Sequence, residues 1–318
     1  MELKDIYKAK QRISKYTRLT PLDESPFLSK LRENNVLLKL ENQQLTGSFK
    51  IRGALNKMLT LTKEERDRGI VAASTGNHAQ GVGYAARMLG IKGQIVIPTY
   101  TPKVKREAIQ RYNLDMIVHG DDYIISEKKA RDIERNEGKT FISAYNDPLI
   151  IAGQGTIGIE IIEQAPDLTT LLVPLGGGGL ISGVGCAVKS INPDIELIGV
   201  QSEVSPVMYE SIKKGRIVEM DLEESVADGL HGGIEEGSIT FDFCQKYVDE
   251  IMLVKEETII RAIGDLLAKQ RQVVEGSGAV GVAALLENPH RFKGKNVGIL
   301  ISGGNIDFEL LQVAFQKV

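Results

Sequence analysis

Short runs of apolar, β-branched residues alternate along this chain with longer amphipathic segments. The runs have the length of buried strands and lie at residues 36–40, 70–73, 95–97, 116–118, 171–173, 197–200 and 297–301. The longer segments have the length of helices and lie at residues 79–89, 103–112, 122–136 and 256–270. This repeated alternation predicts an α/β fold of mostly parallel, twisted sheets with helices on both faces. In such sheets, ligands bind at the carboxyl ends of the strands.

The length of 318 residues fits about two domains. Residues 62–142 hold a compact run of strand–helix units, and we expect them to form a smaller, mobile domain. Residues 1–61 and 143–318 would then form the larger domain of a two-lobed molecule, with the chain crossing between the lobes more than once. The polar, glycine-containing stretch 215–237 is expected to run over the surface as an extended excursion.

Charge and cysteine content narrow the functional classes. The chain has 39 basic and 42 acidic residues, a net charge of −3, which favours neither a nucleic-acid nor a membrane partner. The first residues include acids where a signal peptide needs an apolar run, so we expect a cytoplasmic protein. Only Cys186 and Cys244 are present. We expect both to be buried, reduced thiols, because two isolated cysteines supply neither a disulfide framework nor a metal cluster.

The chain holds 33 glycines, and two clusters of them match the letters of a dinucleotide-binding motif, G-x-G-x-x-G. They lie at residues 153–158 and 276–281. That motif needs a strand immediately before it, so that the chain can turn sharply into a helix. Neither cluster has such a strand. We therefore expect these glycines to allow close helix packing where a side chain would not fit.

Four consecutive glycines at residues 176–179 have a different context. They follow the predicted strand at 171–173 and lead into a segment that can begin a helix. Consecutive amide groups without side chains can converge on one anion, assisted by the helix N-terminus. No lysine followed by serine or threonine completes a nucleotide P-loop. A permanently held cofactor phosphate therefore fits better than a transferable one, and a merely tight turn is the alternative.

Lys50 lies between Phe49 and Ile51, just before a predicted helix. Apolar neighbours disfavour the ammonium form of a lysine, which makes the neutral amine available as a nucleophile. Taken alone, this setting is also typical of a surface lysine whose stem packs on apolar side chains.

In combination, four motifs resemble those of the pyridoxal-phosphate-dependent threonine/serine dehydratases of the catabolic type. These enzymes have the tryptophan-synthase-β-like fold, fold type II, and are related to serine racemase. The motifs occur in the family's order and span positions 48 to 307. They are Ser48-Phe49-Lys50-Ile51-Arg52-Gly53-Ala54, Ser74-Thr75-Gly76-Asn77-His78-Ala79-Gln80-Gly81, Gly176-Gly177-Gly178-Gly179 and Ser302-Gly303-Gly304-Asn305-Ile306-Asp307.

The resemblance implies pyridoxal 5′-phosphate as cofactor, attached to Lys50, which once freed takes the Cα proton of the substrate. It implies that Asn77 binds the ring 3′-oxygen, that Ser302 faces the pyridine nitrogen and that Glu275 lies beside the ring. The full implied cofactor site is Phe49, Lys50, Asn77, Gly176, Gly177, Gly178, Gly179, Leu180, Glu275 and Ser302. The implied site for the substrate α-carboxylate, at a helix N-terminus, is Ser74, Thr75, Gly76, Asn77 and His78. We expect the His78 side chain itself to be structural.

The activity implied is β-elimination of water from L-threonine or L-serine, which gives a 2-oxo acid and ammonia. The partner is thus a small hydroxy-amino acid, and a homodimer or homotetramer is implied. Three alternatives remain open: a racemase, a β-replacement enzyme and a non-enzymatic cofactor-binding protein. Thr75 stands where family dehydratases commonly carry Ala and serine racemase carries Ser, which keeps racemase activity open. Gln201 stands where racemase-type members place a metal-binding Glu, so a metal site is left undecided.

Overall fold

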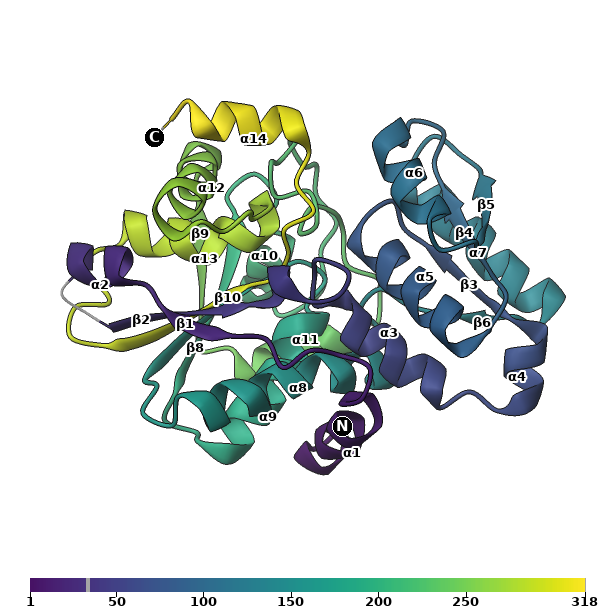
Figure 1. Cartoon of the computed structure of the whole chain (residues 1–318), viewed down its shortest axis with the longest axis horizontal. Helices are drawn as coiled ribbons and strands as arrows, with labels where there is room; N and C mark the ends of the chain where they lie inside the picture. Colours follow the sequence, from purple (N-terminus) through teal and green to yellow (C-terminus); the bar gives the residue numbers. More distant parts are fainter. Residues whose placement is uncertain (33–34, 318) are drawn as a thin grey trace.

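The computed structural model describes residues 1–32 and 35–317, and these form two sheets with helices around them (Figure 1). The larger sheet has the strand order β1-β2-β10-β7-β8-β9, and all its neighbouring strands are parallel except the β1–β2 pair. Its strands are β1 (Leu22–Glu24), β2 (Asn35–Leu40), β7 (Thr170–Pro174), β8 (Glu196–Ser202), β9 (Glu250–Val254) and β10 (Asn296–Ile301).

Helices cover both faces of the larger sheet because its strands are apolar on both sides. Leu172 and Ile299 pack in one core with α12 and α13, whereas Leu171 and Leu300 pack in a second core with α8 and α9. The helices of this lobe are α1 (Leu3–Ile13), α2 (Pro26–Arg32), α8 (Pro148–Gln164), α9 (Gly179–Ile191), α10 (Val207–Lys214), α11 (Ile239–Tyr247), α12 (Glu256–Gln270), α13 (Gly276–Glu287) and α14 (Phe308–Phe315).

The smaller sheet has the order β5-β4-β3-β6 and is parallel throughout. Alternate residues of β3 serve opposite faces, since Ala72 packs with α5 and Ala73 with α7. In Figure 1 this lobe lies at the right. It contains β3 (Ile70–Ala73), β4 (Gly93–Ile97), β5 (Asp115–Val118), β6 (Thr140–Phe141), α4 (Lys63–Arg68), α5 (Asn77–Leu89), α6 (Lys103–Gln110) and α7 (Tyr123–Glu137).

Helix α3 (Lys50–Leu59) lies between the two lobes and packs on both α5 and α8. Its residues Ile51 and Leu55 belong to the core of the smaller sheet, although the predicted boundary at residue 61 placed them with the larger domain. The strands of the smaller sheet all lie within 62–142. The exact division of the chain into domains stays a prediction.

Two glycine clusters have the packing role expected of them. A Cβ on Gly153 would lie 2.6 Å from the carbonyl oxygen of Arg52, where α8 meets α3. A Cβ on Gly155 would lie 2.8 Å from the carbonyl oxygen of Gly183, where α8 meets α9. In the other cluster, a Cβ on Gly278 would lie 2.7 Å from the carbonyl oxygen of Gly303. The backbones touch at these positions, which leaves no room for side chains.

The fold class, the seven predicted strands and the four predicted helices are confirmed, with bounds that shift by a few residues. Strands β1, β6 and β9 were not predicted. Residues 216–237 contain neither helix nor strand, as expected, but the surface assignment is wrong in part because Val218, Ala227 and Ile234 are buried. Both cysteines are free and buried, as predicted.

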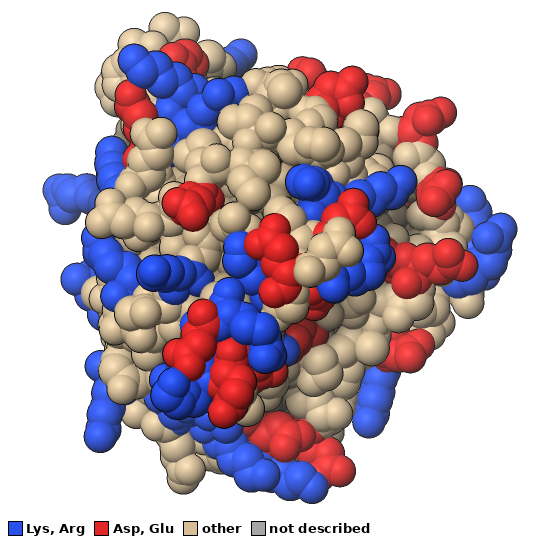
Figure 2. All heavy atoms as spheres, turned by 90° about the vertical axis from the view of Figure 1, so that its right-hand side faces the viewer, with Lys and Arg blue, Asp and Glu red and all other residues tan. Residues whose placement is uncertain are grey.

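Two surface properties bear on possible partners. No helix within residues 1–32 and 35–317 is long and apolar enough to cross a membrane. Figure 2 shows the face of the smaller lobe, where basic and acidic side chains are interspersed with uncharged ones.

Candidate active site

Three strand ends meet between the lobes and carry the predicted site residues. Ser74 directly follows β3, Ser302 directly follows β10, and Gly176 comes two residues after the end of β7. This is the carboxyl-end location expected for a ligand site in parallel sheets. Lys50, the first residue of α3, lies at the same junction.

The Lys50 amine is directed into the protein. Its Nζ donates a hydrogen bond to the carbonyl oxygen of Ala144 at 3.0 Å and lies 5.3 Å from the centre of the Phe49 ring. Burial lowers the pKa of Lys50 to about 8, and the Glu275 carboxyl opposes this shift only in its ionised form. More of the neutral amine is therefore present at neutral pH than for an exposed lysine, and the neutral amine is the form that attacks an aldehyde.

The segment before Lys50 is joined to the strand end after β10. The Phe49 amide donates to the carbonyl oxygen of Ser302 at 3.1 Å, and Ser48 forms an antiparallel bridge with Gly303. Ser302 is buried. The Glu275 amide donates to the Gly303 carbonyl at 3.2 Å, which brings this carboxyl group to the same place.

Asn77, Glu275 and Asn305 form a hydrogen-bonded chain. Asn77 Nδ2 donates to Glu275 Oε1 at 2.7 Å, and Asn305 Nδ2 donates to Asn77 Oδ1 at 2.6 Å. Asn305 Nδ2 is also 2.9 Å from the carbonyl oxygen of Thr46. Because both ends of the Asn77 amide are fixed, one Nδ2 hydrogen remains to donate to a ligand oxygen.

The tetraglycine loop is tightly enclosed by its neighbours. A Cβ on Gly177 or Gly179 would lie 2.8 Å from the Tyr145 side chain, and a Cβ on Gly176 would lie 2.9 Å from Leu230. Gly178 has φ +86°, a conformation that favours glycine.

The loop is also held by Thr240, whose Oγ1 donates to the Gly177 carbonyl at 2.7 Å. Leu180 lies buried in the first turn of α9. Because Tyr145 directly follows Ala144, the wall of the loop is one residue away from the acceptor of the Lys50 amine. Bare amides at a helix N-terminus beside such an amine fit a cofactor with a phosphate and an aldehyde.

Helix α5 packs against the start of α3. A Cβ on Gly81 would lie 3.1 Å from the Lys50 carbonyl carbon, so the two helices are in close contact. Ser74 Oγ accepts a hydrogen bond from the Gly76 amide at 3.2 Å. The turn residues Ser74, Thr75 and Gly76 thus precede the N-terminus of α5, which begins at Asn77.

His78 lies in the first turn of α5 and is buried. Its Nε2 lies 2.8 Å from the carbonyl oxygen of Ile142. Burial, together with the charge of Lys50, lowers the pKa of His78 to about 3, so the ring is uncharged at neutral pH. These contacts are those of a structural side chain.

Every residue predicted for the site thus lies at this junction, but the sequence did not indicate Ala144, Tyr145, Thr240 or Asn305. Asn305 belongs to a quoted motif, and an amide beside two glycines was its only signal. The other three lie far from the motifs in sequence, and only the tertiary fold brings them to the site.

Gln201 is buried, and its amide is engaged by the backbone. Its Oε1 accepts from the Tyr209 amide at 2.8 Å, and its Nε2 donates to the Ser205 carbonyl at 3.4 Å. Within the described part of the chain, no group of three or more His, Cys, Asp or Glu side chains is arranged to hold a metal ion.

Comparisons with known proteins agree with this geometry. A family model described as pyridoxal-phosphate dependent enzyme matches residues 13–303. The L-threonine ammonia-lyase of Thermotoga maritima is 46% identical over 315 residues, which cover 99% of this chain and 78% of that protein. The L-threonine dehydratase catabolic TdcB of Staphylococcus aureus is 42% identical over 311 residues, 96% of this chain and 90% of that protein.

Solved structures of two related enzymes have the same fold as this chain. A T.th. threonine deaminase is 39% identical and superimposes with a TM-score of 0.91, covering 97% of this chain and 99% of its own. A maize serine racemase is 32% identical with a TM-score of 0.92, covering 99% of this chain and 97% of its own.

Proposed function

Because the chain belongs to the family of pyridoxal-phosphate-dependent enzymes, we propose that it is an ammonia-lyase that acts on L-threonine or L-serine. The products are a 2-oxo acid and ammonia. The proposal is supported by relatives named for threonine deamination that match nearly the whole chain.

When bound, pyridoxal phosphate supplies an electron sink that permits loss of the Cα proton and the β-hydroxyl group. In our proposal, Lys50 attaches the cofactor and then accepts the Cα proton at its Nζ. Gly176, Gly177, Gly178, Gly179 and Leu180 hold the phosphate through their backbone amides.

The side chains around the ring complete the proposed cofactor site. The free Nδ2 hydrogen of Asn77 would bind the ring 3′-oxygen, and Phe49 and Glu275 would lie beside the ring. Ser302 faces the pyridine nitrogen. A hydroxyl group there, unlike a carboxylate, does not favour a protonated nitrogen, which suits rapid elimination rather than a long-lived carbanion.

The α-carboxylate of the substrate is assigned to the turn between β3 and α5. The amides of Ser74, Thr75, Gly76, Asn77 and His78 lie at or next to a helix N-terminus, where the partial positive charge stabilises an anion. The observation that carries the whole proposal is the place of the Lys50 amine, which donates to the carbonyl oxygen of Ala144, the residue before the Tyr145 that encloses the glycine loop, and whose pKa burial lowers to about 8.

The test is 2-oxo acid release from a panel of L-threonine, L-serine and bulkier 3-hydroxy amino acids. We expect wild-type protein to release oxo acid and to show the visible absorption band of covalently bound cofactor. Lys50→Ala should lose both. Retention of the band in Lys50→Ala, or β-replacement with O-acetylserine and sulfide in place of oxo acid release, would contradict the proposal.

Racemisation is the second candidate, favoured by the hydroxyl of Thr75 and by the likeness to serine racemase. A hydroxyl facing Lys50 across the substrate would reprotonate Cα from the opposite side. Chiral analysis of residual serine measures this activity, which Thr75→Ala should abolish while oxo acid release persists.

Cellular location and assembly complete the proposal. We infer a cytoplasmic homodimer or homotetramer, on the resemblance to the dehydratase family noted above. Light scattering of the purified protein measures the assembly, and a monomeric mass would contradict it.

A further inference from the structure

The helix that carries Lys50 begins without a side-chain cap. The residue before it, Phe49, has a helical backbone conformation, and its side chain cannot accept a hydrogen bond. The first amides of a helix have no partners within the helix, and an uncapped first turn frays readily. Because Lys50 lies in that turn, the position of its amine depends on contacts from outside the helix.

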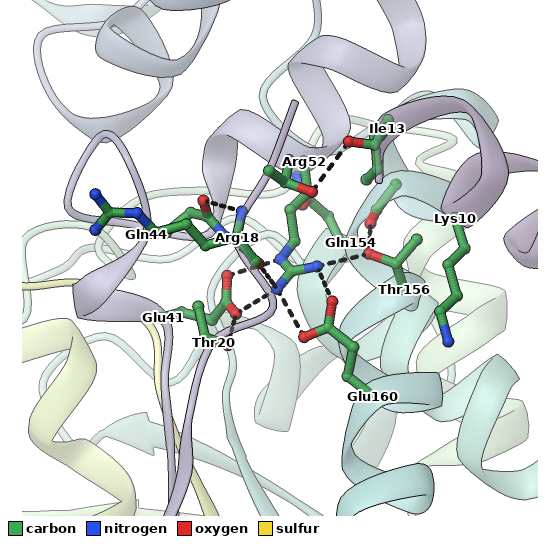
Figure 3. Close-up of polar contacts among 12 residues, drawn as sticks. Lys10, Ile13, Arg18, Thr20, Glu41, Gln44, Arg52, Gln154, Thr156 and Glu160 are labelled. Carbon is green, nitrogen blue, oxygen red and sulfur yellow. Dashed lines mark hydrogen bonds and ion pairs between the residues drawn. The ribbon is translucent and has the colours of Figure 1, made fainter. Parts of the chain in front are cut away.

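Arg52, in the same turn, supplies such contacts through its side chain. Its guanidinium group lies between two carboxylates, as Figure 3 shows. Nε and Nη2 donate to the two oxygens of Glu41, both at 2.8 Å, and Nη1 and Nη2 donate to the two oxygens of Glu160 at 2.6 and 2.9 Å. Further donations reach Thr156 Oγ1 at 3.1 Å and the Arg18 carbonyl at 3.3 Å.

This cluster is buried and balanced in charge. Arg52 is 1% exposed, and Glu41 is fully buried. Burial opposes the charge on Arg52, but Glu41 and Glu160 outweigh it and hold the pKa of Arg52 above its ordinary value. Lys39 provides the second cation, with its Nζ 2.7 Å from the Glu160 oxygen that Arg52 Nη2 also contacts. A bidentate guanidinium pair fixes direction as well as distance, which a single ammonium cannot do.

Helix α8 carries Glu160 and also sets the distance from α3 to the glycine loop. Gly53 in α3 touches Gly153 in α8, and the Gly53 amide donates to Gln154 Oε1 at 3.2 Å. Further along α8, Gly155 touches Gly183 of α9, the helix that begins at the loop. The Lys50 helix and the loop helix thus rest on the same rigid element.

We propose that Arg52 is a positioning residue for Lys50, holding the first turn of α3 at the distance and angle from the glycine loop that the bound cofactor requires. This inference rests on the proposed function, in which Lys50 attaches the cofactor. Arg52 is two positions from Lys50 along the helix, so the two side chains leave the turn on different faces, and its guanidinium group contacts Glu41, Glu160, Thr156 and Arg18.

The test compares two holoenzyme variants that each alter one buried cation of the same cluster. Arg52→Lys keeps the charge but loses the two bidentate pairs. We expect kcat to fall about tenfold to a hundredfold, with the KM for L-threonine changed by less than about threefold. The visible absorption band of the bound cofactor is also recorded as a function of pH, and the pH at which it has changed by half is its pH midpoint. This midpoint should move by about half a unit or more, because the Lys50 nitrogen that bonds the cofactor is held in an altered place.

The matched control is Lys39→Met, which removes a buried cation that does not hold the first turn of α3. We expect it to lower the melting temperature at least as much as Arg52→Lys while leaving kcat and the pH midpoint at their wild-type values. If Arg52→Lys changes the melting temperature alone, or if Lys39→Met moves the pH midpoint equally, the cluster is only structural and the proposal is overturned.

A second variant keeps the test open if Arg52→Lys does not fold. Gln154→Leu alters no charge and leaves the Gly53 amide without its acceptor, so it should move the pH midpoint in the same direction by a smaller amount. An unchanged midpoint would count against the proposal. Wild-type protein and Lys50→Ala are measured alongside, so that failure of the proposed function, seen as no band in wild type, is distinct from failure of this inference.

Discussion

Glu275 is a buried carboxyl group in the centre of the site. Burial, with a contribution from the nearby charge of Asp228, raises the pKa of Glu275 to about 8 against the opposing effects of Asn77, Lys105 and Lys50. The group is therefore mostly protonated at neutral pH, and it can lie beside a ligand ring without adding a negative charge.

This pKa predicts how the stability of the cofactor-free protein depends on pH. Between pH 4.5 and 8 the folded state keeps the Glu275 proton that the unfolded state has lost, so the contribution of Glu275 to the free energy of unfolding falls as the pH rises. Below pH 6.5 the uncharged His78 ring contributes in the opposite direction, so the dependence is read from the difference between wild type and a Glu275 variant. Glu275→Gln removes this dependence and should gain about 2–4 kcal/mol over wild type between pH 5 and 8. Urea denaturation at several pH values measures the difference.

A matched control is Glu257→Gln, an exposed glutamate on α12. It should follow the wild-type pH dependence within error. Parallel curves for wild type and Glu275→Gln would show that the buried carboxyl is ionised in the folded protein, contrary to the shift described here.

Single residues were predictable where their chemistry is carried by the local sequence. The residues next to Lys50 are apolar, which indicates a reactive amine. The four glycines follow a strand, which indicates an anion site. Arg52 does not, because a guanidinium looks the same in sequence whether it is exposed or paired with Glu41 and Glu160. Residues 41, 52 and 160 come together only in the tertiary fold, as Figure 3 shows, so the contacts of Arg52 with the two glutamates could not be predicted from the sequence.

At the scale of an element, the glycine loop is expected to tolerate no side chain. A Cβ on Gly177 would lie 2.8 Å from the Tyr145 ring, and the Cβ and backbone of Tyr145 line the loop at Gly179. Gly177→Ala should displace the ring or the loop, at a cost of about 1–3 kcal/mol. Cofactor affinity should therefore fall about fivefold to a hundredfold. Titration of the cofactor-free protein with pyridoxal phosphate, followed by absorption, gives the affinity.

Gly233→Ala is the control for this substitution. A Cβ on Gly233 has no atom within 4 Å, so the affinity should remain that of wild type. Equal affinity in Gly177→Ala and wild type would mean that this loop does not hold the phosphate.

Elements were predicted well where an apolar run was flanked by clear boundaries. The strands β3, β7 and β10 are such runs, and the motifs that follow them were assigned to one site through the family resemblance. β1 and β6 have only three and two residues, too few for a periodic pattern. The burial of residues within 215–237 was missed because their polar sequence hides the contact of Leu230 with the glycine loop.

At the scale of the whole molecule, Lys105 connects the two lobes across the site. From α6 it pairs with Asp228 at 2.8 Å and lies 3.9 Å from Asp307, both in the larger lobe. The pair is partly exposed, so it contributes at most about 1 kcal/mol. Lys105→Met should therefore raise the KM for L-threonine by no more than about fivefold, through weaker closure of the lobes.

High salt should raise the wild-type KM towards that of Lys105→Met, because ions screen such a pair. The KM of each protein is measured at low and high ionic strength. Lys103→Met, on the same helix with its side chain 89% exposed, serves as the control and should behave as wild type. A salt response in Lys105→Met as large as that of wild type would rule out this contact as its source.

The strand order delays the completion of the larger sheet during synthesis. β2, near the start of the chain, takes its parallel partner from β10, near its end. A ribosome must therefore release almost the entire polypeptide before that central pairing can form, and until then β2 offers an unpaired, apolar edge. Slow maturation and dependence on chaperones at high expression are the expected price of such distant contacts.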